Sequence, residues 1–101
     1  SVEDNLFNHG LFQFLEEESR NYLQGIGKKP NPNYSILYWK DQESLKKGVA
    51  FYEKALTLVD IQDNSAIKHI DTVTVKPSKE AEIKQLIQEM DKAGLLIQKY
   101  Q

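Results

Sequence analysis

The hydrophobic and polar positions of this chain follow two repeats, one with helical and one with strand period. The clearest helical repeat begins after Pro77, where apolar side chains recur at i, i+3, i+4 and i+7 and charged residues fill the other faces. Ser78 is expected to cap this helix and Gly94 to end it, because serine accepts from free helical N–H groups and glycine tolerates a left-handed terminus. The apolar stripe consists of Ile83, Leu86, Ile87 and Met90.

Strand patterns flank this helix on both sides. Residues 69–76 are rich in β-branched side chains and alternate towards their C-terminal end, which indicates a half-buried strand. Residues 95–100 follow Gly94 and again combine aliphatic and polar positions. We therefore predict a strand, a helix and a second strand in the last third of the chain.

The N-terminal quarter carries another helical repeat, between Val2 and Ile26. Gly10 interrupts it, and glycine is unfavourable inside a helix, so the helix is expected to start at Asn8 or later. The acidic run at residues 16–18 falls on the opposite side and is predicted to face solvent. The bulky stripe contains Phe7, Leu11, Phe14, Leu15, Tyr22 and Leu23.

A loop and a strand are predicted next. Residues 25–33 contain two glycines and two prolines, which support neither helix nor strand pairing. Residues 34–40 are apolar or aromatic on both alternating sets, a pattern typical of a central strand that is covered on both faces. This segment is therefore the expected centre of a sheet.

A second strong helix is predicted after Asp41, whose side chain suits an N-cap. Gly48 lies inside it, where a neighbouring element could approach closely. Residues 57–62 allow two interpretations: they either end this helix or form a strand that turns back through residues 63–65. The β-branched residues and the Asp-Asn-Ser turn favour the strand.

These elements predict a single α+β domain over residues 1–101. Residues 1–27 would form an N-terminal helix, residues 28–33 a loop, and residues 34–101 a ferredoxin-like β-α-β-β-α-β sandwich. Without the strand at 57–62 the order becomes β-α-β-α-β, in a two-layer or three-layer α/β arrangement. Core positions are expected at Ile36, Leu37, Val49, Tyr52, Val73, Val75 and Leu96, together with the apolar stripe after Pro77.

Composition narrows the classes of function. The 101 residues are 40% hydrophobic and 28% charged, as in ordinary globular domains, and the net charge of −2 gives no general attraction to nucleic acid or anionic membranes. Without cysteine there can be no disulfide and no thiolate chemistry, which favours a reducing, cytoplasmic location. No apolar run is long enough to span a membrane.

Two groups of residues could carry chemistry. His69 and Asp71 would share one face of a strand, where the carboxylate could orient the imidazole in a small ligand-binding domain or enzyme. His9 is too distant in sequence to complete a metal site with His69, and no cofactor is expected. The segment 28–40 combines positive charge with aromatic faces, as in proteins that bind single-stranded nucleic acid; it includes Lys28, Lys29, Tyr34, Tyr38, Trp39 and Lys40.

The function favoured by the sequence is a small non-catalytic protein-binding or regulatory module. The aromatic side chains of the first helix cannot all pack into one narrow interface with the rest of the domain. Some of them are therefore expected to be available to another protein or to a second copy of the chain. These candidate partner-binding residues are Phe7, Phe12, Phe14 and Tyr22. Nucleic-acid binding through residues 28–40 is the alternative, and the His69–Asp71 pair is the second alternative.

Overall fold

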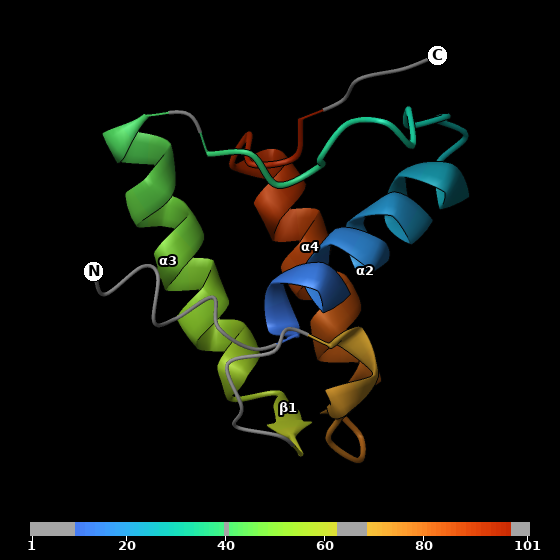
Figure 1. Cartoon of the computed structure of the whole chain (residues 1–101), viewed down its shortest axis with the longest axis vertical. Coiled ribbons are helices and arrows are strands. Elements are labelled where there is room, and N and C mark those ends of the chain that lie inside the picture. Colours follow the sequence, from blue (N-terminus) through green and yellow to red (C-terminus); the bar gives the residue numbers. More distant parts are fainter. Residues whose placement is uncertain (1–9, 40, 63–68, 98–101) are drawn as a thin grey trace.

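The computed structural model describes residues 10–39, 41–62 and 69–97. Within these ranges the chain forms three α-helices and one two-stranded antiparallel sheet. Helix α4 lies between α2 and α3 and packs against both (Figure 1). The elements in chain order are α2 (Leu11–Gly25), α3 (Gln42–Leu56), β1 (Val59–Ile61), the short 3₁₀ helix η1 (Ile70–Thr72), β2 (Val73–Val75) and α4 (Glu80–Lys92).

The core is formed where the apolar stripes of the three helices meet. The stripe of α4 is completely enclosed, since Ile83, Leu86, Ile87 and Met90 are all buried. Of the other predicted core positions, Val49 and Val75 are only half-buried. The remaining predicted core residues are buried as expected, and they are joined by Leu11, Leu15, Leu23, Ala55, Leu58, Val59 and Leu95.

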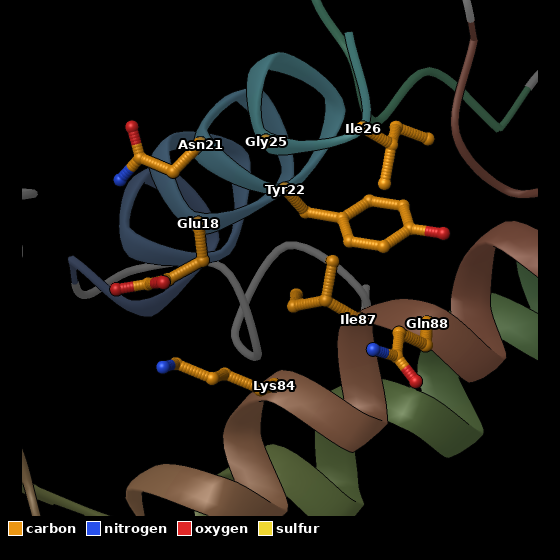
Figure 2. Close-up of a pocket in the computed structure, with 8 residues that line it drawn as sticks. All are labelled: Glu18, Asn21, Tyr22, Gly25, Ile26, Lys84, Ile87 and Gln88. Carbon is orange, nitrogen blue, oxygen red and sulfur yellow. The ribbon is translucent and has the colours of Figure 1, made fainter.

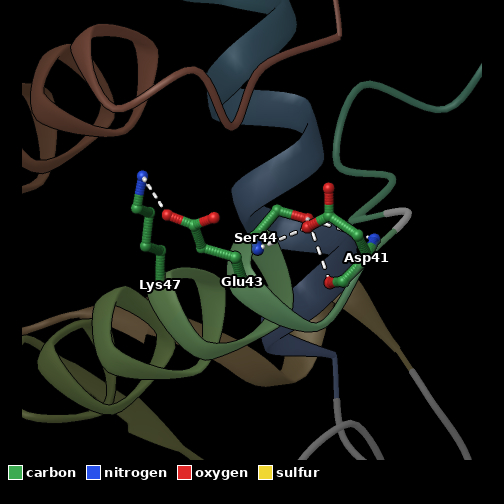
Figure 3. Close-up of polar contacts among 4 residues, drawn as sticks. All are labelled: Asp41, Glu43, Ser44 and Lys47. Carbon is green, nitrogen blue, oxygen red and sulfur yellow. Dashed lines mark hydrogen bonds and ion pairs between the residues drawn. The ribbon is translucent and has the colours of Figure 1, made fainter.

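Helix α3 begins with the predicted cap. The Asp41 carboxylate accepts from the Ser44 backbone N–H at 2.7 Å, and the Ser44 hydroxyl accepts in return from the Asp41 N–H at 3.3 Å (Figure 3). This reciprocal pair satisfies two backbone donors that the first turn leaves free. The prediction of a helix starting after Asp41 is confirmed.

Helix α4 ends as predicted but starts differently. Gly94 has φ +78, its N–H donates to the Asp91 carbonyl, and the Leu95 N–H donates to the Met90 carbonyl at 3.0 Å. These two bonds are the Schellman arrangement that closes a helix. The prediction that Ser78 caps this helix is wrong, because Ser78 has φ +66 and Lys79 occupies the cap position without a side-chain bond.

The predicted ferredoxin-like sandwich is wrong, and so is the β-α-β-α-β alternative. The strand pairing found in the described residues is antiparallel, between β1 and β2, with Val59 opposite Val75 and Ile61 opposite Val73. The interpretation of residues 57–62 as a strand that pairs with the following one is therefore correct, although both strands are shorter than predicted. Residues 63–65 of the predicted turn lie outside the described residues.

The predicted central strand at residues 34–40 is not a strand: residues 34–39 form an irregular segment, and Lys40 lies outside the described residues. Ile36 and Leu37 are adjacent and both buried, whereas Tyr34 and Tyr38 are exposed. A strand would place neighbouring side chains on opposite faces, but here both aliphatic side chains enter the same helical core. The segment crosses one end of the helices (Figure 1).

The predicted final strand is also absent from the described residues. Leu95 and Leu96 are both buried, and the Ile97 N–H donates to the Ile36 carbonyl at 2.8 Å. This bond ties the two irregular segments together without forming a sheet. Residues 98–100 of the predicted strand lie outside the described residues.

The predicted strand at residues 69–76 is strand only at Val73–Val75. Before it, the Thr72 hydroxyl donates to the His69 carbonyl at 2.7 Å, which holds residues 70–72 in the 3₁₀ helix. A β-carbon at Gly10 would lie 1.7 Å from that same carbonyl oxygen. Gly10 therefore lets α2 begin directly against η1.

Candidate binding cleft

A cleft of about 270 Å³ lies between α2 and α4. It is lined along each helix by residues spaced three or four apart, so one face of α2 meets one face of α4 across it (Figure 2). The lining residues are Glu18, Asn21, Tyr22, Gly25 and Ile26 from α2 and its C-terminal cap, with Lys84, Ile87 and Gln88 from α4.

One end of the cleft is apolar. The Tyr22 ring and the Ile26 side chain lie on the α2 side, opposite Ile87 (Figure 2). Ile26 is 50% exposed, although Ile87 beneath is buried. The Tyr22 hydroxyl donates to Asp91 Oδ2 at 3.0 Å, and this bond is the main reason why the pKa of Tyr22 is raised. The ring is therefore fixed in place while an aliphatic side chain next to it remains open to solvent.

The other end of the cleft is charged. Glu18 from α2 and Lys84 from α4 lie there together (Figure 2). Burial raises the pKa of the Glu18 carboxyl, the neighbouring charge of Glu17 raises it further, and Lys84 lowers it only in part. Glu16 and Glu18 are half-buried and Glu17 is exposed, so the acidic run lies at the surface but faces solvent only in part.

The cleft is small for a ligand-binding site. Pockets for drug-sized ligands usually enclose about 300 to 1,000 Å³, and this cleft falls just below that range. One or two side chains of a partner would fill it.

A second cleft lies between the C-terminal end of α3 and α4. It is larger, but the charged side chains that line it already form ion pairs with one another. It encloses about 440 Å³. Lys54 Nζ lies 3.4 Å from Glu89 Oε2, and Lys79 Nζ lies 3.0 Å from Glu82 Oε2. Because these four lining charges pair with one another, the α2–α4 cleft is the better candidate.

The aromatic residues predicted to bind a partner have different surroundings. Phe12, Phe14 and Tyr22 are half-buried and pack against the core. The ring of Phe12 meets the Trp39 ring edge to face, with centroids 5.7 Å apart. Tyr22 is the member of this set that lines the cleft, and Phe7 lies outside the described residues.

The basic and aromatic segment is divided between surface and core. Lys28, Lys29 and Tyr38 are exposed, whereas the indole of Trp39 packs over Gly48 of α3. Side chains of α2 hold the intervening loop, because Arg20 donates to the carbonyls of Asn31 and Tyr34 and Ser35 donates to Glu16. Lys40 lies outside the described residues.

His69 and Asp71 do not share a strand face. Both are exposed, His69 just before η1 and Asp71 within it. Neither lines the two clefts described above. Among the described residues, no group of three or more His, Cys, Asp or Glu side chains could hold a metal ion.

Sequence reasoning missed most of the cleft residues, although a signal was present. Glu18, Tyr22 and Ile26 follow one another at intervals of four, which places them in one row of the helical surface. The cleft residues of α4 are Lys84, Ile87 and Gln88, which lie more than 50 residues further along the chain. No local sequence pattern shows that this face of α4 meets the row on α2.

We found no family model, curated protein or solved structure that matches this chain at a significant level. None of the helices in the described ranges combines the length and the apolar character that crossing a membrane requires.

Proposed function

We propose that this protein is a non-catalytic protein-binding module that holds an apolar side chain of a partner in the α2–α4 cleft. The observation that carries the proposal is the half-exposed Ile26 beside the fixed ring of Tyr22, above the buried Ile87. Protein interfaces draw most of their binding energy from a few apolar or aromatic anchors that enter pockets of this kind.

The two helices also give the cleft a defined shape before binding. Leu23 and Ile87, which belong to the facing helices, are fully or almost fully buried, and the Tyr22–Asp91 hydrogen bond joins α2 directly to α4. A preformed cleft loses little conformational entropy when a partner binds. The arrangement therefore suits recognition better than a loop of the same composition would.

The proposal can be tested by selecting binders from a random peptide library displayed on phage and measuring their affinity by calorimetry. Gly25→Trp is the informative variant, because Gly25 lines the cleft and a β-carbon there meets no atom within 4 Å. A β-carbon can therefore be added at Gly25 without displacing a neighbouring element, and we expect the indole to fill part of the cleft. Gln13→Trp is the matched control, since it adds the same ring to an exposed position of α2 outside the cleft.

We expect selected peptides to contain an apolar anchor, to bind wild type and Gln13→Trp equally, and to lose at least about tenfold in affinity for Gly25→Trp. Circular dichroism should show that both variants remain helical. Failure to select any peptide, or equal binding to Gly25→Trp, would contradict the proposal.

A second candidate function is binding of single-stranded nucleic acid by residues 28–40. The observation that favours it is the exposure of two tyrosine rings, Tyr34 at 51% and Tyr38 at 63%, on the same segment as the exposed Lys28 and Lys29. Aromatic faces and nearby positive charges suit base stacking and phosphate attraction. Trp39 does not add to this surface, because its indole packs over Gly48.

The nucleic-acid candidate predicts a salt-dependent affinity. Replacing Lys28, Lys29 and Lys40 with alanine should weaken binding of a labelled oligonucleotide and lower the log–log salt slope by up to about one unit per lost phosphate contact. Absence of saturable binding by the wild type at physiological salt would exclude this candidate.

We also propose a cytoplasmic location for the module. The absence of cysteine from all 101 residues supports it, since small domains of oxidising compartments commonly depend on disulfides.

A further inference from the structure

Helix α3 carries two apolar side chains that the core leaves half-exposed. Leu45 and Val49 lie about one turn apart on the same face of this helix, and both are half-buried. Phe51 and Leu56 of α3 pack against the described core, whereas this pair is not part of that packing. Because α4 lies between α3 and α2 (Figure 1), α3 is an outer helix, and this face can reach another molecule.

The charged residues of α3 fall into two groups. Glu43 and Lys47 pair with each other at 4.0 Å, and Lys54 pairs with a carboxylate of α4 at 3.4 Å. Lys46 and Glu53 are exposed and form no ion pair with any residue that the structure describes. One positive and one negative charge of this helix are therefore left for solvent or for another molecule.

These two charges lie beside the half-exposed apolar pair. Lys46, Val49 and Glu53 follow one another at i, i+3 and i+7, which places them on one face of α3. The midpoint between Lys46 and Glu53 falls next to Val49, where the helix Gln42–Leu56 also has its centre. The two charges are thus arranged symmetrically about the centre of α3, with opposite signs on either side.

We propose that α3 is the interface of a symmetric homodimer in which two α3 helices pack antiparallel. A twofold axis beside Val49 reverses the direction of the second helix, so Lys46 of each subunit faces Glu53 of the partner subunit. The apolar pair of one subunit then covers that of the other, beside the two ion pairs. A parallel arrangement would bring each charge level with its own copy, and like charges repel.

A second copy is the partner that this pattern selects. A surface with one lysine and one glutamate placed symmetrically complements an identical surface after a half turn, which is the contact of a twofold dimer. No residue that lines the α2–α4 cleft belongs to α3, so the dimer presents two such clefts to other molecules. The inference therefore goes beyond the proposed protein-binding function and does not depend on it.

The dimer is expected to be weak, because two helices of 15 residues form a small interface beside the roughly 1,200 to 2,000 Å² that stable complexes bury. Sedimentation equilibrium of the full chain should therefore cover concentrations from about 1 μM to about 1 mM and show a monomer–dimer equilibrium. A monomer at every concentration in this range would overturn the proposal.

Exchanging the charges tests the pairing itself. Lys46→Glu places like charges opposite each other across the interface, and so does Glu53→Lys, so each variant alone should dimerise at least about tenfold more weakly than the wild type. In an equimolar mixture, a heterodimer of the two variants has opposite charges at both contacts and should form with close to the wild-type affinity. A change of fold in either variant could not produce this recovery.

Lys47→Glu is the matched control, because it makes the same charge change one position along α3, on a side chain that already pairs with Glu43. It should leave the dimer unchanged, as should Gly25→Trp in the α2–α4 cleft. Circular dichroism should show that all of these variants remain helical.

The α3 interface is wrong if neither single variant weakens the dimer, if Lys47→Glu weakens it equally, or if the mixture of variants does not recover it. Peptide binding and dimerisation are separate measurements. Failure of the charge exchange would leave the protein-binding function standing, and failure of the peptide selection would leave the dimer standing.

Discussion

The indole of Trp39 lies directly over the α-carbon of Gly48, so close that a β-carbon at Gly48 would be 2.4 Å from the ring. Gly48→Ala should therefore destabilise the protein, even though alanine favours helix by about 1 kcal/mol over glycine. Displacing a packed ring costs about 1 to 3 kcal/mol, so we expect a net loss of roughly 1 kcal/mol in the free energy of unfolding, measured with urea.

Gly25→Ala is the matched control for that measurement. A β-carbon at Gly25 meets no atom within 4 Å, so alanine should keep its propensity advantage there and leave stability unchanged or slightly raised. Equal effects of the two substitutions would show that the ring does not press on Gly48.

Leu86→Ala should be among the most damaging changes in the core. Leu86 is 1% exposed in the stripe of α4. We expect a loss of about 2 to 5 kcal/mol in the free energy of unfolding, from the lost burial and the cavity that remains. Gln85→Ala, at the exposed neighbouring position, should change it little, and a loss below roughly 1 kcal/mol for Leu86→Ala would contradict the packing of α4.

Gly94→Ala should destabilise the end of α4 through the backbone. Gly94 has φ +78, and an L-residue with a β-carbon loses about 1 to 2 kcal/mol in that region. Gly94→Asn should lose less, because asparagine tolerates the left-handed conformation. Thermal unfolding of the two variants compares them directly, and indistinguishable melting temperatures would argue against a backbone origin.

Glu18→Gln should raise the free energy of unfolding at neutral pH. The pKa of Glu18 is raised above its ordinary value of 4.5 by burial, so the folded protein holds this proton more tightly than the unfolded chain does. Well below pH 4.5 the Glu18 carboxyl is protonated in both the folded and the unfolded protein, and its burial does not reduce the free energy of unfolding. As the pH rises through the folded pKa, the buried carboxyl ionises and the free energy of unfolding of the wild type falls. Urea titrations should thus show the two proteins converging well below pH 4.5 and separating above it.

The helices were predictable because their signals are local. The stripe of Ile83, Leu86, Ile87 and Met90, the cap at Asp41 and the stop at Gly94 each specify structure through neighbours within about one turn. The structure contains all three features.

The incorrect strands share one physical cause. Apolar runs such as Ile36–Leu37 and Leu95–Leu96 indicate burial, but burial alone does not distinguish a sheet from an irregular segment packed on helices. The cleft escaped prediction for a related reason. The sequence predicts Tyr22 as a partner-binding residue because its side chain is aromatic. Its position in the cleft opposite Ile87 and Lys84 depends on how α2 and α4 are rotated against each other.

The bond from the Ile97 N–H to the Ile36 carbonyl has a consequence for the order of folding. It joins positions roughly 60 residues apart, so it closes a loop that contains α3, β1, β2 and α4, and closing a longer loop costs more chain entropy. The contacts inside that loop can form earlier. In pulsed hydrogen exchange the Ile97 amide should gain protection after the amides of α4, which makes the joining of the two irregular segments a late step in folding.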